Sequence, residues 1–125
     1  ETRLHEGETA KVQISVVVRD GYHIQANIVD DESLIPTSLV LDASENVIAM
    51  RNKFPRGKKL KLQGTETFLR VYDGKFSVVL FLTPTVRSQP GNYSLGARLQ
   101  YQACDSQTCF FPRVLEFSIP VEILK

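Results

Sequence analysis

Hydrophobic and polar residues alternate with a period of two along much of this chain. In the segment NYSLGARLQYQA, one side carries Tyr93, Leu95, Ala97, Leu99, Tyr101 and Ala103. The other side is mostly polar. An earlier segment, KVQISVVVRD, places Val12, Ile14, Val16 and Val18 on one face. Alternation of this kind is typical of half-buried β-strands.

Two later segments extend the pattern. LEFSIPVEI places Leu115, Phe117, Ile119, Val121 and Ile123 on one face. KFSVVLFLT is apolar on both faces, which predicts a central strand. No stretch combines a sustained helical period with a capping signal, so the sequence predicts no substantial helix.

Turn residues separate these segments. RDGY, at 19–22, ends the first long strand; YDGK, at 72–75, predicts a hairpin; SQPGN, at 88–92, is a Pro-Gly turn. We therefore expect about seven or eight short strands in an all-β, immunoglobulin-like antiparallel β-sandwich of two sheets. Residues 50–67 form the least regular segment.

Composition adds limits to this picture. The chain has 125 residues, 42% of them hydrophobic and 23% charged, which suits one globular domain over residues 1–125. A net charge of +1 argues against a dedicated nucleic-acid binder. No apolar run approaches the ~20 residues of a membrane span, so we expect no direct membrane insertion. The polar N-terminus is no signal peptide.

Basic residues gather between positions 51 and 61. They are Arg51, Lys53, Arg56, Lys58, Lys59 and Lys61. We interpret this run as a solvated surface, with a docking surface for an acidic partner as the alternative.

The only two cysteines, Cys104 and Cys109, have four residues between them. Strand parity points Ala103 inward and Cys104 outward, and a loop over 105–108 brings Cys109 opposite Cys104. Opposed residues of the non-hydrogen-bonded type lie close enough for a disulfide. A close pair without a metal-ligand cluster fits a disulfide in an oxidising compartment.

The strand after this loop has a conflict of parity. On the same register Phe110 lies opposite Ala103 and points inward, yet Leu115 and the alternating residues after it have the opposite parity. One residue must therefore be absorbed between them. Because Pro112 cannot donate to a strand ladder, a bulge or break near 111–112 is expected.

Two interpretations of the cysteine pair fit the residues equally. Closing so short a loop contributes only roughly 2 kcal/mol, and a domain of this size needs no such crosslink. Exposed, short-loop disulfides are often labile or catalytic, which favours a redox site. The alternative is a non-catalytic binding or adhesion sandwich with a structural hairpin disulfide. His5 and His23 lack paired spacing, so a zinc site is disfavoured.

The stretch YQACDSQTCFFP, preceded by PGNYSLGARL and followed by IPVEIL, resembles the N-terminal periplasmic domain of DsbD, a thiol:disulfide interchange protein. DGYHIQAN and LIPTSLVL look like early strands of that family, and VYDGKFSVVLFL looks like its middle hairpin. The resemblance covers most of the chain. It implies an immunoglobulin-like sandwich with a redox-active cysteine pair. The chain is then either a domain of a longer protein or a stand-alone relative with a different partner.

In that family the domain takes electrons from a thioredoxin-like domain of its own membrane protein. It passes them to oxidised periplasmic proteins, such as the disulfide isomerase and factors of cytochrome c biogenesis. The resemblance therefore implies a periplasmic or otherwise extracytoplasmic protein-disulfide reductase domain with thioredoxin-fold partners. Thiol–disulfide exchange needs no metal or cofactor.

Residue by residue, Cys104 and Cys109 match the redox pair, whose second cysteine exchanges with partners. Tyr22 keeps the aromatic character of the family's residues near the disulfide, while His23 and Gln25 depart from it. The family's aromatic cap falls within 61–69 here, with Phe68 as the nearest candidate. Phe110 offers an apolar neighbour.

Asp105, beside Cys104, has two possible roles. Its charge would oppose thiolate formation if it lay close to the sulfur. Its default role is that of a turn residue.

Overall fold

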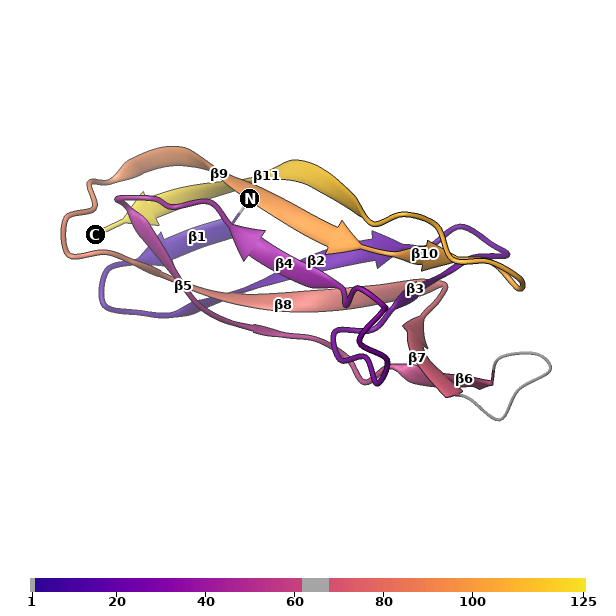
Figure 1. Cartoon of the computed structure of the whole chain (residues 1–125). Coiled ribbons are helices and arrows are strands. Elements are labelled where there is room, and N and C mark those ends of the chain that lie inside the picture. Colours follow the sequence, from indigo (N-terminus) through magenta and orange to yellow (C-terminus); the bar gives the residue numbers. More distant parts are fainter. Residues whose placement is uncertain (1, 62–67) are drawn as a thin grey trace.

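The computed structural model describes residues 2–61 and 68–125. This part of the chain contains strands and turns but no helix, as the sequence predicts. Its eleven strands exceed the predicted number (Figure 1). They are β1 (Thr2–His5), β2 (Ala10–Val17), β3 (His23–Gln25), β4 (Ser38–Leu41), β5 (Val47–Lys53), β6 (Lys58–Lys61), β7 (Phe68–Tyr72), β8 (Lys75–Pro84), β9 (Gly91–Tyr101), β10 (Ala103–Cys104) and β11 (Arg113–Leu124).

Two sheets face each other and enclose the main core. One has the strand order β1-β11-β9-β4 and the other has the order β2-β8-β5. Neighbouring strands are antiparallel, except that β1 runs parallel to β11. The predicted class is confirmed: the protein is an all-β, immunoglobulin-like sandwich.

Strand β8 is the centre of its sheet, as its two apolar faces predict. Val78, Leu80 and Leu82 are buried in the main core. On the outer face the ring of Phe81 is covered by two cations. The Arg51 guanidinium lies 4.4 Å from the ring centroid and the Lys11 ammonium 5.8 Å. The stems and charged heads of two basic side chains therefore cover the Phe81 ring on this face.

A third sheet, with the order β10-β3-β7-β6, lies at one end of the sandwich (Figure 1). The prediction of two sheets was therefore wrong, because the described residues form three sheets. The predicted YDGK hairpin is also wrong, because β7 belongs to this third sheet and β8 to another. Both edges of β8 are already occupied by β2 and β5. The turn, with Gly74 at φ 60°, carries the chain between sheets instead.

The described part of the segment expected to be irregular, residues 50–61, is largely strand. It includes most of β5 and all of β6, while residues 62–67 lie outside the described part. The basic side chains of these strands are exposed. Lys58 pairs with Asp73 of the neighbouring turn at 2.7 Å.

The predicted break near Phe111 and Pro112 is confirmed. Tyr101 pairs with Arg113, whereas Cys104 pairs with Cys109. Two residues, 102–103, therefore lie opposite three residues, 110–112, and one residue is absorbed there. The same break transfers the chain from the sheet of β9 to the sheet of β10.

The first residues of β11 extend past the main core. Leu115 has the inward parity that was expected, yet it is 55% exposed. Ile119, Val121 and Ile123, further along the same face, are buried. Parity alone places Leu115 on the correct side of the strand, but the opposing sheet does not cover it.

Candidate functional site

Cys104 and Cys109 form a disulfide across a tight hairpin, with their Cα atoms 3.9 Å apart. The Phe110 amide donates to the Ala103 carbonyl at 2.8 Å on one side of the pair. The Asp105 amide donates to the Thr108 carbonyl at 2.9 Å on the other side. The cysteines thus occupy the non-hydrogen-bonded type of position that the sequence predicts.

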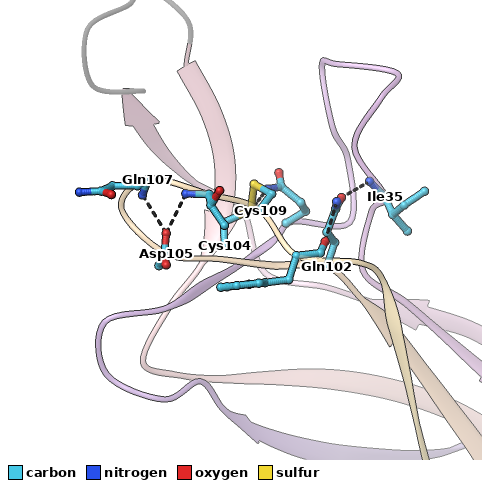
Figure 2. The surroundings of a disulfide bond; sticks show 9 residues. Ile35, Gln102, Cys104, Asp105, Gln107 and Cys109 are labelled. Carbon is cyan, nitrogen blue, oxygen red and sulfur yellow. Dashed lines mark hydrogen bonds between the residues drawn. A yellow bond between two sulfur atoms is a disulfide. The ribbon is translucent and has the colours of Figure 1, made fainter.

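Asp105 closes the loop between the cysteines. Its Oδ1 accepts hydrogen bonds from the amides of Gln107, at 2.8 Å, and Thr108, at 2.7 Å (Figure 2). These bonds to the ionised form hold the pKa of Asp105 below its usual value. The turn role expected for Asp105 is therefore observed.

The two cysteines differ sharply in exposure. Cys104 is only 1% exposed, whereas Cys109 is exposed. The expectation that Cys104 points outward to solvent is wrong. Cys104 does lie on the face opposite Ala103, as parity requires. That face is not open to solvent, however, because the Gln25 side chain contacts the Cys104 sulfur and Cys104 pairs with His23 of β3.

The polar side chain of Gln25, on β3, lies against Cys104. The side-chain Nε2 of Gln25 donates a hydrogen bond to Cys104 Sγ at 3.3 Å. Gln25 is fully buried, with 0% of its surface exposed. The sequence marks Gln25 as a departure from the family's aromatic residues but does not predict this contact.

Gln102 joins three segments around the hairpin. Its Oε1 accepts from the Ile35 amide at 2.8 Å, and its Nε2 donates to the Phe110 carbonyl at 3.1 Å (Figure 2). Parity points Gln102 outward, but it is buried. The parity conflict in the sequence could have indicated such a buried polar side chain, because a strand break frees backbone groups that then need side-chain partners.

His23 lies beside the disulfide, in a cavity of about 190 Å³ that both cysteines also line. Burial lowers the pKa of His23, while the charges of Asp73 and Asp105 oppose this effect. Its Nε2 is buried and has no hydrogen-bond partner among the described residues. The lowered pKa favours the neutral form of the imidazole.

The aromatic candidates separate into two groups. The rings of Tyr22 and Phe110 lie 6.1 Å apart and line an apolar groove of about 540 Å³. Phe110 is 41% exposed, so the expectation that it points into the core is wrong. Leu69, rather than Phe68, lines the cavity beside the disulfide. The aromatic cap stays a prediction, because residues 62–67 lie outside the described part.

The groove and the disulfide lie on opposite faces of the cysteine hairpin. Ala103 and Phe110, which form one opposed pair, line the groove. Cys104 and Cys109, the next pair, line the smaller cavity with His23. Because alternate residues of a strand point to opposite faces, the hairpin has one apolar face and one sulfur-bearing face.

No group of three or more His, Cys, Asp or Glu side chains in residues 2–61 and 68–125 is placed to hold a metal ion. The same residues contain no helix long and apolar enough to cross a membrane.

No protein-family model and no curated protein sequence matches this chain. Among solved structures, the chain is similar to the N-terminal domain of DsbD from Neisseria meningitidis, in its reduced form. The two share 18% sequence identity with a TM-score of 0.53, over 86% of this chain and 74% of the other. This likeness confirms the resemblance to the DsbD N-terminal domain at the level of the fold.

Proposed function

We propose that this chain is a thiol–disulfide exchange domain whose redox centre is the Cys104–Cys109 disulfide. The observation that carries the proposal is the unequal exposure of the two cysteines. Cys109 is open to an attacking thiolate, while Cys104 is 1% exposed and held against β3. Exchange requires an accessible sulfur and a second sulfur held within reach of it.

The position of the disulfide supports this role over a purely structural one. The loop that it closes is already held by the two hydrogen bonds to the Asp105 carboxylate. The main apolar core lies between the other two sheets. A crosslink over so short a loop adds roughly 2 kcal/mol in the chain-entropy model.

In the proposed reaction, a partner thiolate attacks Cys109 Sγ. The bond between the two cysteines breaks, its electron pair goes to Cys104 Sγ, and a mixed disulfide forms between Cys109 and the partner. The partner's second thiolate then attacks the sulfur of the partner's first cysteine in the mixed disulfide. This step releases the Cys109 thiolate. The domain gains two electrons and the partner becomes oxidised.

The second half of the relay runs through the same sulfur. The Cys109 thiolate attacks the disulfide of an oxidised protein, and Cys104 resolves the mixed disulfide. The fold likeness supports thioredoxin-fold partners in an extracytoplasmic space, and a longer parent protein that supplies the electron donor. Phe110 and Phe111, which follow Cys109, would give such partners an apolar contact surface.

A pair of single variants tests this proposal. Cys104→Ser leaves only the exposed thiol, so it should accumulate a stable mixed disulfide with oxidised thioredoxin on non-reducing gels. Cys109→Ser leaves only the buried thiol and should trap little. Equal or greater trapping by Cys109→Ser would contradict the assignment of roles. A lack of trapping by both variants, together with no reduction of the wild-type disulfide by reduced thioredoxin, would overturn the exchange function.

A further inference from the structure

We propose that Gln25 is a catalytic residue of this exchange reaction, because its side-chain amide stabilises the Cys104 thiolate that leaves when Cys109 is attacked. This inference rests on the proposed function. It concerns a residue that resemblance to the family does not assign, since Gln25 stands where members carry aromatic side chains.

The contact between Gln25 and Cys104 has a defined direction. A sulfur within a disulfide carries no hydrogen and can only accept a hydrogen bond, so the N–H end of the amide must face it. Nε2 of Gln25 lies 3.3 Å from Cys104 Sγ. The same N–H can continue to donate when the sulfur becomes a thiolate, and the bond then strengthens because the acceptor is charged.

Burial makes this donor important. Cys104 is 1% exposed, so a negative charge that forms on its sulfur receives little solvation from water. An uncompensated buried charge raises the pKa of a thiol and makes the thiolate a poorer leaving group. Gln25 supplies a preformed dipole at the atom where charge develops.

A second observation is that the buried Gln25 side chain has an unpaired oxygen. A buried amide is unfavourable unless its polar atoms find partners, and Oε1 of Gln25 has none among residues 2–61 and 68–125. Packing alone would be served as well by an apolar side chain of similar volume, such as Met or Leu. A polar residue with an unpaired oxygen beside a reactive sulfur therefore indicates a chemical role.

The backbone holds Gln25 in place for this role. Its N–H donates to the Gln102 carbonyl at 3.1 Å, and its carbonyl accepts the hydroxyl of Thr37. On the other side, Gln25 pairs with Val71 of β7. The amide is thus positioned before the reaction begins, and little reorganisation is needed as the charge forms.

The test is the pKa of the Cys104 thiol, measured from thiolate ultraviolet absorbance in a Cys109→Ser background. Gln25→Met removes the donor at similar length and should raise the thiol pKa by about one to two units, since a hydrogen bond to a charged group is being lost. Gln25→Glu keeps the shape and should also raise the pKa, because in its ionised form it has no donor and places a negative charge beside the sulfur. Gln13→Met, the same change on the exposed face of β2, should leave the pKa unchanged.

In the otherwise wild-type protein, Gln25→Met should slow reduction of the disulfide by dithiothreitol several-fold, while Gln13→Met should not. An unchanged Cys104 pKa in both Gln25 variants would overturn the inference. If Gln25→Met fails to fold, the Gln25→Glu variant decides the question. Neither readout needs a protein partner, so failure of the trapping experiment above would reject the proposed relay without being confused with failure at Gln25.

Discussion

The main sandwich core and the cysteine-bearing end of the molecule bury different kinds of residues. The main core is apolar and draws on both large sheets; it contains Leu4, Val12, Leu39, Val47, Val78, Leu80, Leu82, Leu95, Ala97, Leu99, Ile119, Val121 and Ile123. In contrast, the buried polar residues of the described part are Gln25, Thr37 and Gln102. Gln25 and Gln102 form hydrogen bonds at the cysteine hairpin, and the Thr37 hydroxyl donates to the carbonyl of Gln25.

The cysteine end has only a small apolar cluster of its own, formed by Val18, Ile24, Ala26 and Tyr72. The Tyr72 hydroxyl supports it: its Oη lies 2.9 Å from Asn27 Oδ1 and 2.8 Å from the Pro55 carbonyl oxygen, and these two acceptors share its one hydrogen. The apolar core that stabilises the fold therefore lies apart from the disulfide. The large core can hold the fold while the small end keeps polar groups beside a disulfide.

Truncation within the main core should destabilise the protein most. Leu82 is fully buried on β8, so Leu82→Ala should lower the free energy of unfolding by about 2–5 kcal/mol. Denaturant melts measure this change, and Val86→Ala is the control because Val86 is 99% exposed. The reduction potential of the disulfide should stay the same. A loss below about 1 kcal/mol would show that the stability does not depend on this core.

Reduction of the disulfide should cost less. We expect the reduced protein to stay folded and to lose no more than roughly 2 kcal/mol of stability, as the entropy of a short loop allows. Melts with and without reductant measure the difference. Complete unfolding on reduction would mean that the cysteine end, rather than the sandwich core, holds the structure together.

Loss of one buried amide should have a smaller effect. Gln102→Leu removes the hydrogen bonds to the Ile35 amide and the Phe110 carbonyl, and we expect about 1 kcal/mol of destabilisation. Gln100→Leu is the matched control, because Gln100 is an exposed neighbour on β9. Equal effects of the two substitutions in denaturant melts would argue against a structural role for the Gln102 bonds.

The smallest effect should be a dependence of stability on pH. Burial lowers the folded-state pKa of His23 below its ordinary value of 6.5. Above that value the residue is neutral in both states, so its contribution to stability is complete. As the pH falls below 6.5, the unfolded chain takes up a proton that the folded protein resists, and stability decreases.

Substituting His23 should remove this part of the pH dependence. Melts of His23→Gln between neutral and mildly acidic pH should show a flatter profile than wild type, whereas the exposed His5→Gln control should not. A His23→Gln profile identical to wild type would indicate that the imidazole is not held neutral by the fold.

The sequence predicts much of the sandwich because alternation records which side of a strand faces the core. The phases of β2, β9 and the second half of β11 are correct on these grounds. Even the inserted residue near Pro112 follows from two conflicting phases. The YDGK hairpin fails because a turn motif carries no information about which strands occupy the edges of β8.

The site is less predictable for a related reason. The position of the cysteine pair and its register follow from spacing, but the burial of Cys104 does not. Parity places Cys104 on the face opposite Ala103, but it does not tell which residues cover that face, here Gln25 and those that line the cavity beside the disulfide. The contact between Gln25 and Cys104 joins residues that are 79 positions apart in the chain, so no local pattern records it.

The most direct test of a redox-active Cys104–Cys109 pair is its reduction potential, obtained by equilibrating the protein with thiol–disulfide buffers of known ratio. We expect a value close to that of thioredoxin, about −270 mV, or less negative, because a relay disulfide must be reducible by a thioredoxin-fold donor. A value well below about −300 mV, in the range of structural disulfides of secreted proteins, would contradict the exchange function and favour a structural crosslink.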